Sequence, residues 1–390
     1  MSIMKIENDK SRNVLTSPFI AMTKNKGNTI HNLFSNEIIE INTEIYSVLK
    51  KCKNQTTLKK LYELYGIDII SDLFNKNLLF FEDEIWKATN VEYLEIETST
   101  HCNYRCEYCP SAVKSKRIDY MSMELFDEII TKAENSKKIK AVTFHSYNEP
   151  TIDKYFEERI LRLAKTNIKL LLHTNASNLD EKKIKILKES NILSMVIINL
   201  PSLDEQSFKN MTGYPNFSTT IKNIDNAVEN ELPVRFSIQG TINEVNQNYA
   251  GIKNKYGDLV HDITSYVDKY NGYSSDRAGI LKNKYDRNVN IEEKYLYGFC
   301  TQMLNWLHIS VNGNIFICCN DYFNNEVYGN ISDCEIDELA QCEKAQILRK
   351  MIFGYIEAPN DFICRKCIDM ELAKILSIYN RSIIPNFSSF

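Results

Sequence analysis

The most constraining feature of the sequence is an alternation of short apolar segments and amphipathic segments that runs from Val91 to about residue 275. Six segments have the apolar, β-branched composition of strands: 92–100, 141–147, 168–175, 195–201, 233–240 and 262–268. Helical spacing is found between them at 123–135, 154–165, 181–190, 204–211 and 218–229. Strands that alternate with helices form βαβ units with a parallel sheet. Six units are too few for a closed eight-stranded barrel, so the α/β fold predicted for 91–275 is a partial (β/α)6 barrel.

The segments on either side of this alternation have different patterns. Residues 1–87 begin with an alternating hairpin pattern at 29–42. Three helices and a short strand are then expected at 43–52, 56–66 and 67–84. The remaining predicted parts are a charged linker (276–296), a small α+β domain (297–373) and a tail (374–390).

Charge and composition exclude several classes of partner. The 390 residues carry 47 basic and 51 acidic side chains, a net charge of −4 that does not favour nucleic acid or an anionic membrane surface. The start of the chain, MSIMKIENDK, has no apolar signal core, and no stretch approaches the ~20 apolar residues of a membrane span. A cytoplasmic protein with no membrane partner is therefore expected.

The cysteines are numerous and unevenly distributed. Of the 11 cysteines, Cys52 stands alone, three lie within 102–109, and seven lie within 300–367. Disulfides are disfavoured in a reducing compartment, so clustered cysteines indicate metal binding or catalysis.

The first cluster has the spacing Cys102-x3-Cys106-x2-Cys109 and follows the first predicted strand. Ligand sites of α/β sheets gather at that end of the strands. Three thiolates leave one iron of a four-iron cluster without a protein ligand, and an open coordination position is where chemistry can occur. The alternative is a zinc site with His101 as the fourth ligand, although zinc favours paired C-x2-C spacing.

This spacing, with Tyr108 before the last cysteine, closely resembles the signature of the radical SAM superfamily. The resemblance implies a [4Fe–4S] cluster on the three cysteines, whose open iron binds S-adenosylmethionine. An electron from a donor such as flavodoxin or ferredoxin would then cleave the cofactor to a 5′-deoxyadenosyl radical, which abstracts a hydrogen atom from the substrate. Tyr108 would flank the adenine.

The resemblance extends to other strand ends. The run SYNEP (146–150) resembles a Gly-Gly-Glu-Pro run of the family, with Tyr147 and Asn148 in place of the glycines. The implied partner of the methionine amino group is Glu149, and a carboxylate suits an ammonium group. Other implied cofactor contacts are Asn148, Thr174, Asn175, Asn199 and Arg235. Each of these residues has an alternative role as a turn or barrel-mouth hydrogen-bonding residue.

The second cysteine group has the pattern Cys300-x12-Gly313-x4-Cys318, followed by Cys364 and Cys367. Between the first two cysteines, LHISVNGNIFICC (307–319) predicts a hairpin that turns at Asn312-Gly313 and brings them together. This group resembles the auxiliary-cluster domains called SPASM and twitch. Since no cysteine follows Cys367, the resemblance implies one auxiliary [4Fe–4S] cluster on these four residues. A structural staple or a zinc ribbon is the alternative, and the remaining residues Cys319, Cys334 and Cys342 are expected to be filler or surface thiols.

The hairpin and helices of residues 1–87 resemble the winged-helix-like domain that recognises precursor peptides in maturases of ribosomally made peptides. The whole chain then resembles a radical SAM maturase whose N-terminal module binds a leader segment. The product could be a thioether, a carbon–carbon cross-link, an epimer or a desaturated residue. Three alternatives stay open: an N-terminal module that only packs on the barrel, a twitch-type dehydrogenase of a small alcohol, and a non-catalytic zinc-binding adaptor.

Overall fold

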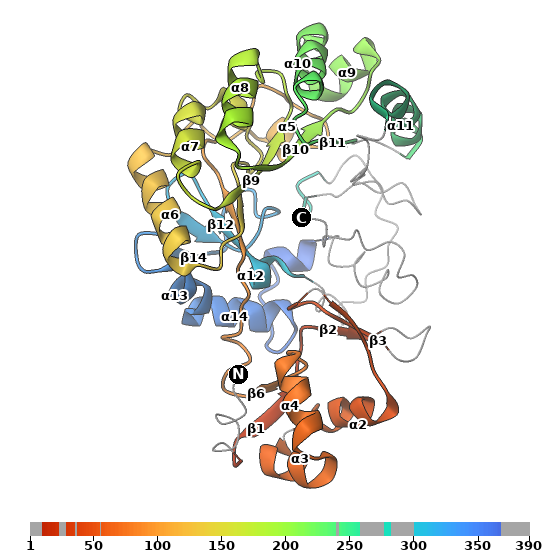
Figure 1. Ribbon diagram of the computed structural model, residues 1–390, viewed down its shortest axis with the longest axis vertical. Coiled ribbons are helices and arrows are strands. Elements are labelled where there is room, and N and C mark those ends of the chain that lie inside the picture. Colours follow the sequence, from red (N-terminus) through yellow and green to blue (C-terminus); the bar gives the residue numbers. More distant parts are fainter. Residues whose placement is uncertain are drawn as a thin grey trace.

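The computed structural model describes residues 10–22, 29–35, 37–54, 56–238, 242–257, 277–281 and 300–367. Three parts follow one another along its longest axis, with the N-terminal module at one end and the helices of the barrel at the other (Figure 1). The predicted strand 262–268, most of the predicted linker and the predicted tail 374–390 lie outside the described residues. The predicted domain boundaries stay predictions.

The barrel is built on parallel strands in the order that the sequence predicts. Its neighbouring strands are β11, β10, β9, β8 and β7, all paired in parallel. Their bounds are β7 (Tyr93–Ile96), β8 (Ala141–Thr143), β9 (Lys169–Thr174), β10 (Leu193–Asn199) and β11 (Val234–Ser237). The α/β fold with a parallel sheet at its core is confirmed.

Helices cover the outer face of this sheet (Figure 1). They are α6 (Met123–Ser136), α7 (Phe156–Leu163), α8 (Glu181–Ser190), α9 (Glu205–Thr212), α10 (Phe217–Glu229) and α11 (Ile242–Tyr256), with the short turns α5 (Pro110–Val113) and η1 (Pro150–Ile152). Buried residues line one side of each helix, as in α6, where Phe126, Ile129, Ile130 and Ala133 follow helical spacing. No helix in the described ranges is long and apolar enough to cross a membrane.

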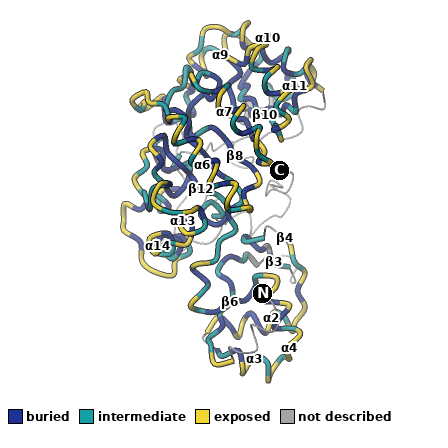
Figure 2. Tube along the Cα trace, turned by 60° about the vertical axis from the view of Figure 1, so that its left-hand side comes forward, coloured by how far each residue is buried: buried dark blue, intermediate teal, exposed yellow. Residues whose placement is uncertain are grey.

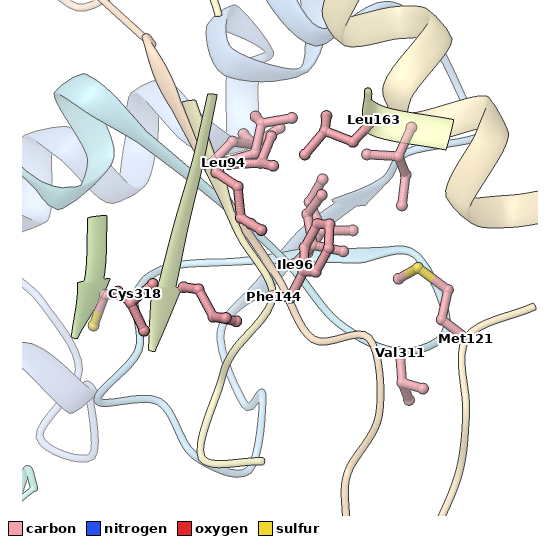
Figure 3. Close-up of a cluster of buried hydrophobic side chains, with 14 of the residues drawn as sticks. Leu94, Ile96, Met121, Phe144, Leu163, Val311 and Cys318 are labelled. Carbon is pink, nitrogen blue, oxygen red and sulfur yellow. The ribbon is translucent and has the colours of Figure 1, made fainter. Parts of the chain in front are cut away.

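Side chains of the parallel strands alternate between an apolar outer face and an inner face that carries the polar and ionisable residues. Leu94 and Ile96 of β7 are fully buried in the same core as Phe144 and Leu163 (Figure 3), and buried residues follow the strands throughout the barrel (Figure 2). Successive side chains of a strand point to opposite faces, so the positions between these belong to the inner face. At or just past the strands these positions carry Glu95, His145, His173, Asn199 and Arg235. The inner face is therefore the polar side of the sheet.

The second cysteine region continues the barrel sheet. Strand β12 (Trp306–Ile309) pairs in parallel with β7, with His308 opposite Glu95. Strand β13 (Asn314–Phe316) pairs antiparallel with β12, and Gly313 at the turn has a φ of 80°, so the predicted hairpin is confirmed. The remaining elements are β14 (Val327–Asn330), α12 (Gln302–Asn305), α13 (Ile336–Gln341), α14 (Glu343–Ile352) and η4 (Ile363–Lys366). No local pattern in the sequence predicts the pairing of β12 with β7.

The N-terminal module contains the predicted hairpin and the three predicted helices. The hairpin is β3–β4, and it forms a sheet with β2, while β1 lies between β5 and β6 in a second sheet. The bounds are β1 (Asn13–Thr16), β2 (Ile20–Met22), β3 (Thr29–Asn32), β4 (Glu37–Glu40), α2 (Thr43–Lys51), β5 (Thr56–Thr57), α3 (Leu58–Tyr65), α4 (Ile67–Asn75) and β6 (Leu79–Phe81). Strands β1 and β2 were missed. The winged-helix character of the module stays a prediction.

An aromatic cluster joins the N-terminal module to the C-terminal helices. The ring of Phe19 is fully buried and lies 4.9 Å from the ring of Phe353, just past α14. Trp86 lies in the same cluster, and its carbonyl accepts hydrogen bonds from Nε (3.0 Å) and Nη2 (2.8 Å) of the buried Arg349 on α14. The module is therefore packed against the rest of the chain by apolar contacts and by a buried guanidinium group.

We expect Phe19→Ala to lower the free energy of unfolding of the N-terminal module by about 3–5 kcal/mol, the usual cost of removing a buried phenylalanine ring. Urea unfolding followed by tryptophan fluorescence measures this loss in a Trp306→Phe background, which leaves Trp86 as the single tryptophan. Leu64 on α3 is 56% exposed, so Leu64→Ala is the control and should change stability by less than about 0.5 kcal/mol. Equal effects of the two substitutions would contradict the described packing.

Candidate active site

The three cysteines of the first cluster lie in the loop that leaves the C-terminal end of β7. Cys106 is buried, and Cys102 and Cys109 are half-buried. Burial, together with the nearby Glu149 and Cys109, raises the pKa of Cys102 to about 12. Burial, together with the other two thiols, also raises the pKa of Cys106. Three thiols this close become thiolates readily only beside a positive charge, so the trio fits a cationic metal cluster.

Backbone contacts hold the cysteine loop against α9. The N–H groups of Arg105 and Glu107 donate to the carbonyls of Thr212 (2.8 Å) and Met211 (3.0 Å). Gly213 has a φ of 67°, and a Cβ at that position would lie 3.4 Å from Cβ of Arg105. Glycine therefore allows the left-handed turn after α9, while the space beside Arg105 would accept a Cβ in ordinary contact.

Glu149 connects the ends of β8 and β9. Its Oε1 accepts hydrogen bonds from Thr151 N (3.0 Å), Thr151 Oγ1 (2.6 Å) and Thr174 Oγ1 (2.6 Å). Its Oε2 accepts one from Asn175 N (2.6 Å). Burial raises the pKa of this carboxyl group, while the four donors oppose the shift. A carboxylate oxygen can accept more than one hydrogen bond, so Oε2 has capacity for a further donor such as an ammonium group.

Asn148 and Asn175 are engaged within the loops that carry them. Asn148 Nδ2 donates to Phe144 O (3.1 Å), and its Oδ1 accepts from Ser146 N (2.6 Å). Asn175 Nδ2 donates to Oδ1 of Asn103 (2.9 Å) in the cysteine loop. The structure thus brings Asn175, Thr174 and Glu149 together beside the cysteines, while Asn148 shapes its own turn. Their assignment as cofactor contacts stays a prediction.

Tyr108 and Asn199, which lie 91 residues apart in sequence, meet in the structure. Asn199 Nδ2 donates to the hydroxyl of Tyr108 (3.0 Å). Asn199 Oδ1 is buried and has no hydrogen-bond partner in the described part of the chain, which marks a place for a ligand donor. Arg235, on the neighbouring strand, donates from Nη1 to Val234 O (2.9 Å), so its expected pairing with a carboxylate stays untested.

A buried ion pair that the sequence analysis missed fixes the loop of Glu149. Arg159 of α7 donates from Nε to Oδ2 of Asp153 (3.0 Å), and both side chains are at most 1% exposed. Its Nη2 donates to the carbonyls of Met121 and Thr98, next to the cysteine loop. Arg159 is therefore a positioning residue that ties the Glu149 loop to the end of β7.

A group of ionisable side chains on the inner face was also missed. The rings of His145 and His173 stack with centroids 4.1 Å apart, and burial lowers the pKa of both, which favours neutral imidazoles. Glu95 Oε1 lies 3.3 Å from Nδ1 of His308. Burial raises the pKa of Glu95, but His308 and His145 outweigh burial and hold the pKa below its usual value. Polar residues at alternate positions of otherwise apolar strands, as in YLEI and LLLHT, could have predicted this group from the sequence.

The four predicted auxiliary ligands gather at one place. Cys318 is buried, and its pKa is raised first by burial and then by Cys319, Cys364, Cys300 and Cys367. Burial, followed by Cys300 and Cys367, likewise raises the pKa of Cys364. The four thiols therefore fit a second polynuclear site, with Cys319 beside it.

The two other cysteines of this region lie elsewhere. Cys342 Sγ accepts from Ala345 N (3.5 Å) at the start of α14, and Cys334 lies near it. That Cys334 and Cys342 are filler or surface thiols stays a prediction.

Residues 96–249 match the radical SAM superfamily, and residues 300–368 match SPASM, an iron–sulfur cluster-binding domain. The chain belongs to the radical SAM superfamily and carries a SPASM domain. It is therefore a radical SAM enzyme, and its two domains imply S-adenosylmethionine and iron–sulfur clusters. Both matched ranges fall within the predicted domains 91–275 and 297–373.

Individual relatives are more distant. A curated relative, the S-adenosyl-L-methionine-dependent 2-deoxy-scyllo-inosamine dehydrogenase of Niallia circulans, is 21% identical over 290 residues, which are 72% of this chain and 93% of that protein. Streptococcus suis SuiB bound to S-adenosylmethionine is similar in fold, with a TM-score of 0.55 and 15% identity over 94% of this chain and 99% of SuiB. The structure of anSMEcpe with bound AdoMet has a TM-score of 0.52 and 21% identity over 70% of this chain and 88% of that chain.

We expect Glu149→Gln to weaken S-adenosylmethionine binding about ten- to a hundredfold, because a charged hydrogen bond contributes about 1.5–3 kcal/mol. Anaerobic equilibrium dialysis with labelled cofactor measures the change. Thr151→Val removes a 2.6 Å hydrogen bond to the carboxylate of Glu149 but keeps the charge of that carboxylate. This variant should therefore weaken cofactor binding much less. Equal losses in both variants would mean that the loop geometry, rather than the charge of Glu149, holds the cofactor.

Proposed function

We propose that the protein is a radical SAM maturase that modifies a ribosomally made precursor peptide bound through its leader segment. A [4Fe–4S] cluster with S-adenosylmethionine supplies a 5′-deoxyadenosyl radical for hydrogen abstraction when both are bound. Cys102, Cys106 and Cys109 are the proposed ligands of that cluster. In this proposal Glu149 would accept a hydrogen bond from the methionine ammonium group, Asn199 and Tyr108 would line the adenosyl side, and Arg235 would pair with the methionine carboxylate.

The observation that carries the peptide assignment is the extent of the fold similarity. SuiB, which has also been solved bound to the precursor peptide SuiA, matches 94% of this chain when bound to S-adenosylmethionine. The match to anSMEcpe covers only 70%. The larger coverage requires that most of the N-terminal module contributes to the match with SuiB. A module shared with a precursor-peptide-binding enzyme supports a peptide substrate.

The edge strand β4 is the proposed leader site. In the described residues β4 pairs with β3 on one side only, at the end of the order β2-β3-β4. Its Ile38 is 63% exposed, and Glu37 and Glu40 are also exposed. An extended peptide can add to such an edge through main-chain hydrogen bonds and apolar contacts. The two glutamates favour a leader that carries basic residues beside an apolar one.

The auxiliary site is proposed to hold one further [4Fe–4S] cluster on Cys300, Cys318, Cys364 and Cys367. Four thiolates leave this cluster no open iron for S-adenosylmethionine, so electron transfer is its proposed role. The first cluster would receive its electron from a donor such as flavodoxin or ferredoxin.

Replacing Cys102, Cys106 or Cys109 singly by alanine is expected to reduce the iron content from about eight to about four atoms per chain, because only the auxiliary cluster remains. Formation of 5′-deoxyadenosine with dithionite should stop. Iron analysis of anaerobically reconstituted protein and chromatography of the nucleoside measure both effects. Cys334→Ala is the control and should keep all the iron. Zinc in both sites would support the metal-binding adaptor instead.

Ile38→Glu is expected to reduce modification of the precursor peptide at least tenfold while 5′-deoxyadenosine formation continues, because it removes the exposed apolar side chain that the leader would contact at β4. The assay is mass spectrometry of the peptides encoded by short reading frames beside the gene, after anaerobic incubation. Leu64→Glu changes another exposed apolar residue of the module, on α3, and should have little effect. Point variants are preferable to deleting residues 1–87, since deletion would expose Leu304 and Phe353.

A twitch-type dehydrogenase of a small alcohol is the second candidate. The similarity to the Niallia circulans dehydrogenase over 93% of its length supports this alternative. Such an enzyme needs no leader site, so it would leave every peptide unmodified and would be insensitive to Ile38→Glu. Oxidation of a polyol with no dependence on the module would favour it over the maturase.

A further inference from the structure

Tyr147 has a backbone conformation that is unusual for its residue type. Its φ is 66°, in the left-handed region that favours glycine, and it occupies a position where the related run of the superfamily has glycine. An aromatic residue is strained there, and such strain persists only when surrounding contacts hold it. The contacts of the side chain therefore explain why tyrosine is found in the loop that leads to Glu149.

Two of those contacts are with the SPASM domain, and a third is with Arg277. The hydroxyl of Tyr147 donates to Oδ1 of Asn320 (3.4 Å), and its ring meets the ring of Tyr322 edge-on with centroids 5.3 Å apart. The guanidinium of Arg277 lies 5.6 Å from the centroid of the same ring. Tyr147 thus reaches from the end of the second barrel strand to the turn that follows β13.

Asn320 continues this contact to a proposed cluster ligand. Its Nδ2 donates to Sγ of Cys367 (3.5 Å), and its side chain is buried. A thiolate sulfur only accepts hydrogen bonds, so the amide NH2 group must face Cys367 and the amide oxygen must face Tyr147. The orientation of one amide is therefore fixed from both sides, by a sulfur atom and by a tyrosine hydroxyl.

We propose that Asn320 tunes the reduction potential of the auxiliary cluster through its hydrogen bond to Cys367, and that Tyr147 is the positioning residue that holds Asn320. A hydrogen bond to a ligating sulfur stabilises the negative charge gained on reduction and so raises the potential. The chain Tyr147–Asn320–Cys367 also joins the loop of Glu149 to the auxiliary site. The inference rests on the proposed function, because it takes Cys367 as a cluster ligand.

The test is an electron paramagnetic resonance titration of the auxiliary cluster alone. The full-length Cys102→Ala/Cys106→Ala/Cys109→Ala protein provides it, since only the auxiliary ligands remain. In that background Asn320→Leu is expected to shift the one-electron reduction equilibrium up to tenfold toward the oxidised cluster, or about 59 mV. Tyr147→Phe should shift it in the same direction by a smaller amount.

Tyr322→Phe is the matched control. The ring of Tyr322 packs against Tyr147, and the hydroxyl of Tyr322 donates to Lys114 O (2.9 Å). The substitution therefore keeps the ring contact and removes only the hydroxyl that bonds Lys114. Its potential should equal that of the background protein. If the Asn320→Leu protein loses the cluster, the potential of the Tyr147→Phe protein tests the proposal, because that substitution removes only one oxygen atom.

Two failures are distinguishable by iron analysis. If the triple-alanine protein holds about four irons and neither Asn320→Leu nor Tyr147→Phe changes the potential, the tuning role is overturned while the auxiliary site stands. If the triple-alanine protein holds no iron, the auxiliary site itself is wrong, and the role of Asn320 is overturned with it. A shift of equal size in Tyr322→Phe would also overturn the role of Tyr147, because general repacking would then explain it.

Discussion

The parallel pairing of β12 with β7 determines how the two cysteine groups are related. It joins segments more than 200 residues apart in sequence, and sets His308 opposite Glu95. The three cysteines of the first group follow β7, while Cys318 follows the hairpin that begins with β12. Strand β12 ends at the same edge of the sheet as β7, and β13 runs back antiparallel to β12, so the β7–β12 register also places the turn that follows β13. In that turn the hydroxyl of Tyr322, four residues past Cys318, donates to the carbonyl of Lys114 (2.9 Å), five residues past Cys109.

Buried charged groups then fix the loops at that edge. Glu149 accepts four hydrogen bonds from the loop after β8 and from the end of β9. Arg159 joins Asp153 to carbonyls near β7 and the cysteine loop. Removing one partner from such a buried pair leaves an uncompensated charge, which is costly, so the loops have little freedom to shift independently. A site held in this way can keep its geometry before a cofactor binds.

Local patterns were enough to predict most elements and the cysteine groups, because helical spacing, the strand composition of 168–175 and the Asn312-Gly313 turn each act over a few residues. Strands β1 and β2 were missed because three or four residues carry too little pattern. The β7–β12 pairing, the Arg159–Asp153 pair and the His145–His173 stack depend on distant segments that no local pattern connects. The polar residues at alternate strand positions could be read from the sequence. That they all point to the same face of the sheet depends on how the strands pair, which the sequence does not show.

Tyr147 stands where the superfamily pattern has glycine, and it keeps the positive φ that the loop requires. Glycine needs no support at a positive φ, whereas tyrosine does, and here the support comes from Asn320 and Tyr322 of the other domain. The side chain of Asn148 in turn caps its own loop through Ser146 N and Phe144 O. The two residues that stand where the superfamily pattern has glycine thus hold the loop in different ways, Tyr147 by contacts with the other domain and Asn148 by hydrogen bonds within the loop. The loop that carries Glu149 depends, for that reason, on the SPASM hairpin being in its place.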